Sequence, residues 1–137
     1  MNVQRKWLRD WRRRRDSGAA AVEFAIVLPV FLVMLFGIIQ FGAVLFLHNN
    51  MVNAARETAR RMAVAELTAA QADAFAQNYL AGWNVAFVVF ATEPAPGTVN
   101  GDVFVQITAP ASDAALINFP IPWSGNLVAE VTMRRES

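Results

Sequence analysis

The longest feature of the hydrophobic pattern is an uncharged run from Phe24 to Leu47. Its 24 residues would extend about 36 Å as an α-helix, and the hydrocarbon core of a bilayer is about 30 Å thick. We therefore predict a transmembrane helix over residues 19–47. The alternative is a buried helix of a soluble protein, which requires a domain large enough to cover it on every side.

The helical period continues beyond this run. Apolar side chains recur on one side of the predicted helix at Met51, Ala55, Ala59, Met62 and Ala63, whereas polar ones occupy other positions at Asn53, Arg56, Glu57, Arg60 and Arg61. Glu57 and Arg61 have the spacing of an i,i+4 ion pair. Thr68 and Gln71 then read as a capping box, which predicts a break near Leu67 and a second helix from about residue 69 to 81, closed by Gly82. Residues 48–82 thus form a helical region.

From Trp83 onward, the spacing of the apolar residues changes from that of a helix to the alternation of a β-strand. Residues 85–91 are rich in β-formers, and apolar positions alternate over 103–108 and 127–133, so we predict three strands. Prolines and the Asn100-Gly101 pair supply the first reversal. The longer loop over 110–126 carries Phe119, Ile121 and Trp123, which either dock a partner or fold back onto a small core. A small antiparallel β region over 83–137 follows.

Together these elements predict an α+β fold. A long N-terminal transmembrane helix extends into a small domain with a second helix and a three-stranded antiparallel sheet. The sheet is expected to pack on the helical rod, because a lone small sheet would be only marginally stable.

Positive charge is concentrated at the N-terminus. Residues 1–18 form a basic leader with seven cations against Asp10 and Asp16, while the whole chain has a formal net charge of +1. This asymmetry places the N-terminus in the cytoplasm and the region after the span outside it. It also argues against a nucleic-acid partner, because a polyanion binder would carry its basic residues in the folded part. The lipid bilayer is the first partner that the sequence predicts.

The sequence offers no catalytic constellation. It has no cysteine, and His48 is its single histidine. Asp73, Asp102 and Asp113 lie on different predicted elements, so they define neither a carboxylate dyad nor a metal site. We therefore predict that the protein is not an enzyme and needs no metal or cofactor.

One acid stands at the edge of the apolar run. Glu23 follows Gly18 by five residues and lies just beyond the basic leader. A carboxylate in a membrane helix is costly, so its presence indicates processing and assembly chemistry rather than simple anchoring.

Several segments around Glu23 carry a family resemblance. They read SGAAAVEFA over residues 17–25, VLP over 27–29, GIIQFG over 37–42 and NAARETAR over 53–60. In this order, within residues 16–61, they resemble the TadE-like pseudopilins of the tight-adherence (Flp-type, type IVc) pilus. The von Willebrand-type extension of the larger TadG relatives is missing, and the major Flp pilins are much shorter, so the TadE-like branch fits best.

The resemblance implies a pilin-like minor pilin of the bacterial inner membrane. It implies a cut by a prepilin peptidase between Gly18 and Ala19, which makes Glu23 the fifth mature residue and Phe24 the second half of a Glu-Phe pair. The implied partners are that peptidase, other pilins and pseudopilins through the N-terminal helix, and the inner-membrane pilus assembly platform. The implied location is a single pass through the inner membrane with the C-terminus in the periplasm, and then an extracellular pilus.

The chemistry of such a site can be argued from the residues themselves. Gly18 lacks the Cβ that would crowd the bond to be cut. Cleavage would remove all seven leader cations and create an ammonium on Ala19, which Glu23 can complement from one turn further along the helix. In a filament the carboxylate could instead pair with the amine of a neighbouring subunit. A further reading is an acid that reaches the headgroups or is protonated.

Two other features leave alternatives open. Pro29 removes one backbone donor inside the span and can kink the helix. Residues 52–54 resemble a small-x-small cleavage site, where a cut would release a soluble domain. The main alternative function is an uncleaved single-span anchor that presents a small extracytoplasmic interaction domain.

Overall fold

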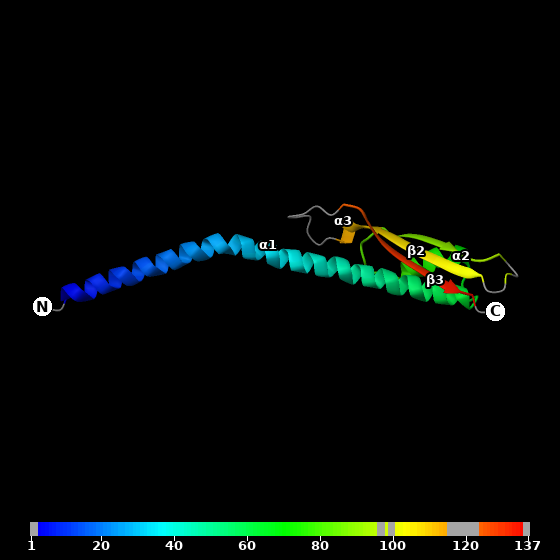
Figure 1. Ribbon diagram of the computed structural model, residues 1–137, viewed down its shortest axis with the longest axis horizontal. Coiled ribbons are helices and arrows are strands. Elements are labelled where there is room, and N and C mark those ends of the chain that lie inside the picture. The colour runs from blue at the N-terminus through cyan, green and yellow to red at the C-terminus, as the bar shows by residue number, and fades with distance from the viewer. Residues whose placement is uncertain (1–2, 96–97, 99–100, 115–123, 136–137) are drawn as a thin grey trace. The chain divides into compact units, whose positions relative to one another are not determined.

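The computed structural model describes residues 3–95, 98, 101–114 and 124–135, and side chains from Gly18 onward. It confirms the α+β class, with a long helix first and a three-stranded antiparallel sheet at the end (Figure 1). The chain divides into two compact units, residues 1–39 and residues 40–137. We describe each unit separately.

Helix α1 runs from Val3 to Ala63 as one element that passes through both units and through Pro29. After Ala63 the chain turns, and Ala65 has a positive φ of 58°. The Glu66 N–H there donates to the Arg61 carbonyl at 2.8 Å, which uses one of the carbonyls left over at a helix end. The helix therefore ends close to the break predicted near Leu67.

The first unit exposes most of its apolar side chains. Val22, Phe24 and Ile26 are each at least 60% exposed, and the exposure continues through Ile38 and Ile39. The described helix from Gly18 onward is long and apolar enough to cross a membrane. The described part of this unit thus offers its apolar surface to its surroundings.

The sheet in the second unit is a simple meander. Strands β1 (Val88–Thr92), β2 (Asp102–Pro110) and β3 (Asn126–Arg134) lie in the order β1-β2-β3. Both pairings are antiparallel, with Phe90 opposite Gln106 and Gln106 opposite Glu130. All three predicted strands are confirmed, although β1 begins three residues later than the β-rich segment over residues 85–91 that predicted it.

A close approach of the backbone explains the glycine before β2. A Cβ on Gly101 would overlap the ring of Pro94, so a larger residue at this position would require the neighbouring chain to shift. The Arg135 N–H also donates to the Gly101 carbonyl at 2.9 Å. This end of the sheet therefore depends on a glycine next to β2.

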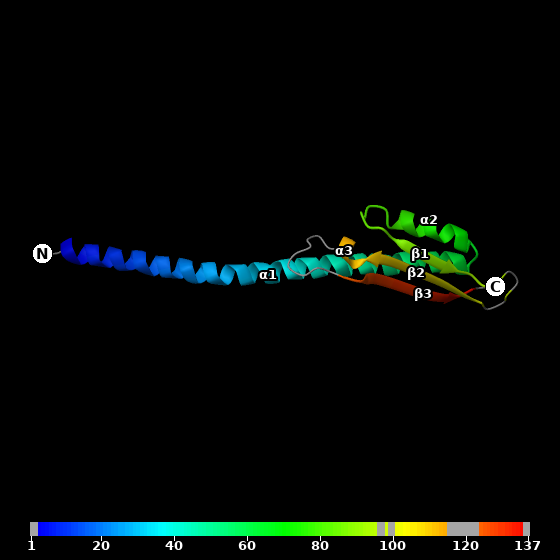
Figure 2. The ribbon, with the colours of Figure 1, turned by 90° about the horizontal axis from the view of Figure 1, so that it is seen from above.

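Helix α2 (Ala69–Tyr79) lies alongside β1 (Figure 2). Gln71 Oε1 accepts a hydrogen bond from the Thr68 N–H at 3.1 Å, which confirms the predicted capping box. The helix ends at Tyr79, two residues before the predicted end. A four-residue helix, α3 (Ala111–Ala114), follows β2, in a segment that the sequence alone places within a loop.

The core of the second unit lies between its helices and one face of the sheet. On the sheet side, Val103, Val105, Ile107 and Ala109 of β2 are fully buried. On the helix side, buried residues follow the helical period along α1: Val44, Leu47, Met51, Ala54, Ala55, Thr58, Ala59, Met62 and Ala63. The apolar stripe predicted beyond Leu47 is confirmed. Ala72 and Ala76 of α2 are buried as well, and α2 packs on β1.

Candidate processing and assembly site

The predicted cleavage bond lies within α1. Gly18 and Ala19 are both exposed helical residues. A Cβ on Gly18 would meet no described atom within 4 Å, so the structure itself does not require glycine at this position. A requirement for glycine would then come from a binding partner that approaches the backbone.

Glu23 and Phe24 lie one turn further along the same helix. Glu23 is exposed, and Phe24 is 64% exposed. Within the described part of the chain, no ion pair or side-chain hydrogen bond involves Glu23. The carboxylate is thus available to a group from outside the described chain, or to a new amine within it.

Pro29 is also exposed, and α1 continues on both sides of it. Because proline has no N–H, the carbonyl of Ala25 loses its usual i+4 donor at this point. The kink predicted at Pro29 stays a prediction.

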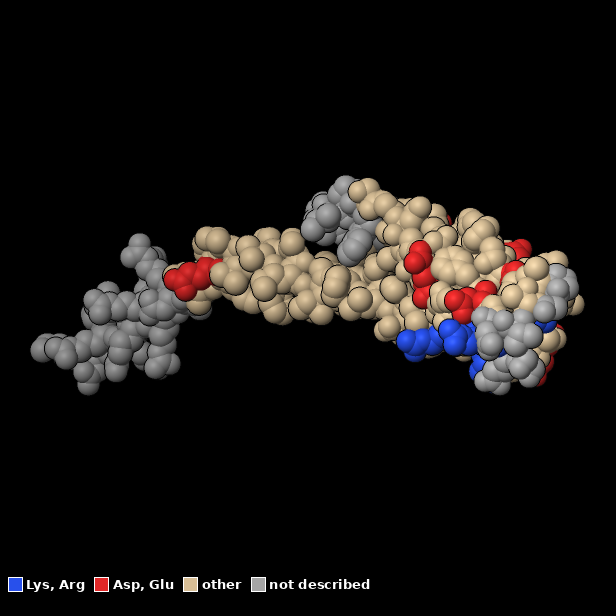
Figure 3. All heavy atoms as spheres, turned by 45° about the vertical axis from the view of Figure 1, so that its right-hand side comes forward, with Lys and Arg blue, Asp and Glu red and all other residues tan. Residues whose placement is uncertain are grey.

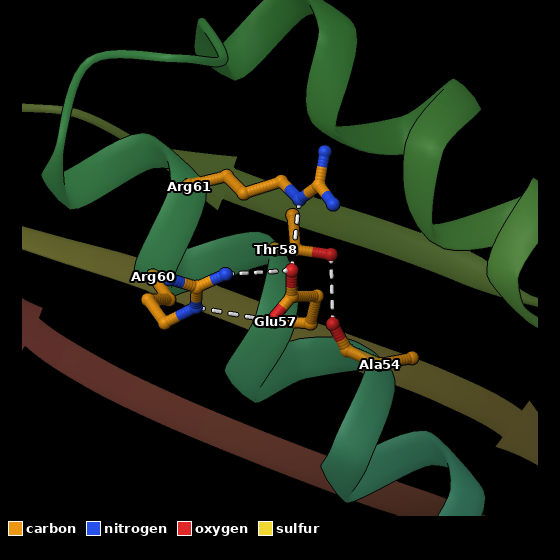
Figure 4. A network of polar contacts seen from close by, with 5 residues as sticks. All are labelled: Ala54, Glu57, Thr58, Arg60 and Arg61. Carbon is orange, nitrogen blue, oxygen red and sulfur yellow. Dashed lines mark hydrogen bonds and ion pairs between the residues drawn. The ribbon is translucent and has the colours of Figure 1, made fainter.

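A second polar cluster lies further along α1, in the second unit. Glu57 accepts hydrogen bonds from Arg60 at 3.1 Å and from Arg61 at 2.8 Å (Figure 4). The predicted pair of Glu57 with Arg61 is therefore confirmed, with Arg60 as an additional partner. The Arg61 guanidinium also lies 4.7 Å from the ring centre of Phe75 on α2, which links the two helices. Figure 3 shows basic side chains gathered along one side of this unit, with acidic side chains next to them.

The buried hydroxyl next to this cluster is satisfied locally. Thr58 Oγ1 donates to the carbonyl of Ala54 at 2.7 Å, so a polar side chain can lie in the core without the cost of an unmade hydrogen bond.

The arginine pair should make stability depend on pH. Hydrogen bonds from Arg60 and Arg61 lower the pKa of Glu57 from 4.5 to about 2, so its stabilising effect is complete above about pH 4.5 and is lost as the pH falls toward 2. We expect Glu57→Gln to lower the melting temperature at neutral pH, with a difference from the wild type that closes over this range. Circular dichroism of the detergent-solubilised chain measures it.

The matched control is Glu93→Gln. Glu93 is an exposed acid of the same unit with no ion pair among the described residues. A difference for Glu57→Gln that stays constant from neutral pH to pH 2 would contradict the role of the carboxylate charge.

The structure adds a feature that the sequence pattern missed, at the start of the second unit. Gln40, Val44 and Leu47 are buried there, although they belong to the continuous apolar run. On another side of the helix, the ring of Phe46 lies 5.6 Å from that of Trp83, at a tilt of 48°. The uniform hydrophobicity of the run concealed this change of environment. The position of Trp83 at the end of the helical pattern was the only sequence signal near it.

Other predicted features have different outcomes. Phe119, Ile121 and Trp123 lie outside the described residues. Among the residues that the structure describes, no three His, Cys, Asp or Glu side chains are grouped so that they could hold a metal ion. Asp102 lies 3.9 Å from Arg134 across β2 and β3, and Asp73 accepts a hydrogen bond from Gln77. Asp73 and Asp102 are thus both engaged in local contacts at the surface.

Comparison with known proteins adds one finding. A family model described as TadE-like protein matches residues 18–60. No curated protein matches the chain, and no solved structure does. The matched segment begins at Gly18 and includes the apolar helix, Glu23, and the Glu57–Arg60 pair. Residues 18–60 are therefore similar to the TadE-like family, which confirms the resemblance found in the sequence motifs.

Proposed function

We propose that this protein is a minor pilin that takes part in assembly of a tight-adherence pilus after a prepilin peptidase removes its leader. The single observation that carries the proposal is the TadE-like match, which starts at Gly18, the residue before the expected cut. Among the described residues, one helix is long and apolar enough to serve as the membrane anchor. We place it in the inner membrane, with the N-terminus in the cytoplasm and the second unit in the periplasm.

The exposed apolar surface of the first unit supports a dual use of α1. Side chains around the helix are exposed, including Phe31, Met34 and Ile38. Such a surface suits lipid before assembly, and it suits the helices of other pilins when the subunit leaves the membrane. Association of the subunit with an assembly platform in the membrane would provide the transition between the two.

Glu23 gives the proposed processing step a consequence for assembly. Before the cut, seven leader cations precede it. After the cut, the new Ala19 ammonium lies four residues before Glu23 on the helix, within the range of an i,i+4 contact. The carboxylate can therefore neutralise the amine in its own chain or in a neighbouring subunit, and either pairing lowers the cost of bringing a charged end into an apolar filament core.

One observation favours the alternative of an uncleaved anchor. Helix α1 begins at Val3 and continues through the Gly18-Ala19 bond, and a peptidase must reach an extended backbone to cut it. In the pilin proposal, the peptidase unwinds α1 locally around Gly18, and the absence of a Cβ makes this easier because glycine gains the most conformational freedom when a helix opens. The two functions differ in the fate of the leader.

The N-terminus of the protein in cells distinguishes the two functions. We expect the protein, purified from membranes of cells that express the peptidase, to begin at Ala19. Intact mass and N-terminal sequencing measure this. A protein that retains Met1 to Gly18 would contradict the pilin proposal and support the uncleaved anchor.

A pair of glycine variants tests whether the cut depends on Gly18 itself. Gly18→Val should abolish maturation, whereas Gly37→Val should leave it unchanged. A Cβ at either position meets no described atom within 4 Å, and both glycines lie in α1, so loss of cleavage in the first variant alone would report recognition by the peptidase rather than misfolding.

A further inference from the structure

The predicted transmembrane helix, residues 19–47, is divided between the two units, and its two parts differ in length. Residues 19–39 of this helix, which belong to the first unit, extend about 32 Å, and this length is close to the roughly 30 Å of a hydrocarbon core. Residues 40–47 add about 12 Å more. The second part is therefore left over once the hydrocarbon core has been crossed.

The helix surface over residues 40–47 remains apolar on the sides that the core does not cover. Leu45 is 48% exposed and Phe46 is 62% exposed, while Val44 and Leu47 face the core. Polarity begins immediately afterwards, at His48, Asn49 and Asn50. The second unit thus begins with two helical turns whose outer side is apolar, and whose buried side carries Val44 and Leu47 together with the polar Gln40.

Trp83 extends this apolar surface beyond the helix. It follows α2, and its backbone N–H donates a hydrogen bond to the Leu80 carbonyl at 3.3 Å. The backbone of Trp83 is therefore tied to the end of that helix. It is half-buried against the core and lies against Phe46. Tryptophan combines a large apolar ring with one N–H donor, and this combination concentrates it in the interfacial layers of membranes.

We propose that residues 40–47 of α1, together with Trp83, lie in the headgroup layer of the membrane, with Phe46 and Trp83 as an aromatic anchor that fixes the depth of the second unit. The occupant of this surface is lipid, because the surface is continuous with the membrane-spanning part of α1 and ends where polar residues begin. The roughly 12 Å of residues 40–47 is also comparable with the interfacial layer, since headgroups raise a bilayer from about 30 to about 40–45 Å. The proposal rests on the membrane anchor of the proposed function but not on leader cleavage.

Fluorescence of Trp83 in vesicles tests this placement. The full chain, with Trp7, Trp11 and Trp123 each replaced by phenylalanine, is reconstituted into phosphatidylcholine and phosphatidylglycerol vesicles. Part of the lipid carries bromine atoms, either near the headgroup end or near the methyl end of the acyl chains. We expect bromines near the headgroups to remove more than half of the Trp83 emission, bromines near the methyl ends to remove less, and aqueous iodide to have little effect.

Two reporter variants in a Trp83→Phe background provide the comparison. Phe31→Trp places the reporter in the span, where Phe31 is 59% exposed. Val64→Trp places it at an exposed position just after α1, about 27 Å beyond Phe46 by helical rise. The first should be quenched by bromines near the methyl ends, and the second by iodide alone.

Each outcome decides the proposal. If Trp83 behaves like Val64→Trp while Phe31→Trp is quenched by brominated lipid, the anchor stands and the proposed headgroup contact is wrong, which would leave the surface to another protein subunit. If Phe31→Trp is not quenched by lipid either, the membrane anchor itself fails, and the placement of Trp83 fails with it.

Discussion

Replacing Leu47 by alanine is expected to cost the second unit about 2–5 kcal/mol of unfolding free energy, the usual range for a large aliphatic side chain removed from a well-packed core. Leu47 is fully buried, and it packs in one cluster with core residues of the sheet. Single domains are stable by only about 5–15 kcal/mol, so the variant should lose much of its resistance to denaturant. The measurement is loss of circular dichroism with increasing urea, in detergent micelles.

Leu45→Ala is the matched control for this experiment. The substitution is identical, the position is two residues away in the same helix, and Leu45 is 48% exposed. Because about half of its surface stays exposed whereas Leu47 is fully buried, the unfolding midpoint should change much less than for Leu47→Ala. Equal effects of the two substitutions would show that residues 40–47 form a plain membrane segment and that the core of the second unit begins later.

Replacing Glu23 by alanine is expected to abolish filament assembly while leader cleavage continues. The substitution removes the carboxylate that we propose to pair with the Ala19 ammonium. Breaking a buried ion pair by removing one partner costs about 3–5 kcal/mol, and each 1.4 kcal/mol is about a factor of ten in an equilibrium. Incorporation of the variant should therefore fall at least about a hundredfold.

Three readouts keep the assembly experiment specific. N-terminal sequencing reports cleavage, membrane content reports folding and retention, and the amount of sheared filaments reports assembly. Glu23→Asp keeps the charge on a shorter side chain and should restore part of the assembly, whereas Glu23→Gln should not. Normal filaments from Glu23→Ala would show that the carboxylate has no role in assembly.

The parts of the fold with strong local signals could be predicted from the sequence. Thr68 and Gln71 identify the start of α2 through a hydrogen bond between near neighbours. The spacing of Glu57 and Arg61 predicts their ion pair, because a helix alone brings such residues together. Alternation of apolar residues predicts the strands, since successive side chains of a strand point to opposite faces. Arg60 as a second partner of Glu57 depends on side-chain conformation, which spacing does not specify.

The candidate site divides in the same way. Gly18 and Glu23 stand out in the sequence because a small residue and a charge interrupt or border an apolar run, and the family match begins at that glycine. The environment of their side chains is a structural fact: both are exposed residues of a continuous helix. Nothing in the spacing of residues indicates whether the helix continues through the bond to be cut.

The sequence by itself determined that a membrane-length apolar helix precedes a small α+β region, because the length of an uncharged run and the change of period are properties of the chain alone. Only the tertiary structure decided where the second unit begins. Every residue from Phe24 to Leu47 is uncharged and nearly all are apolar, so the pattern has no contrast between a side that faces lipid and a side that faces a core. Packing of Val44 and Leu47 against a sheet some 60 residues later in the chain supplies that contrast, and it leaves Phe46 and Trp83 together on the outside.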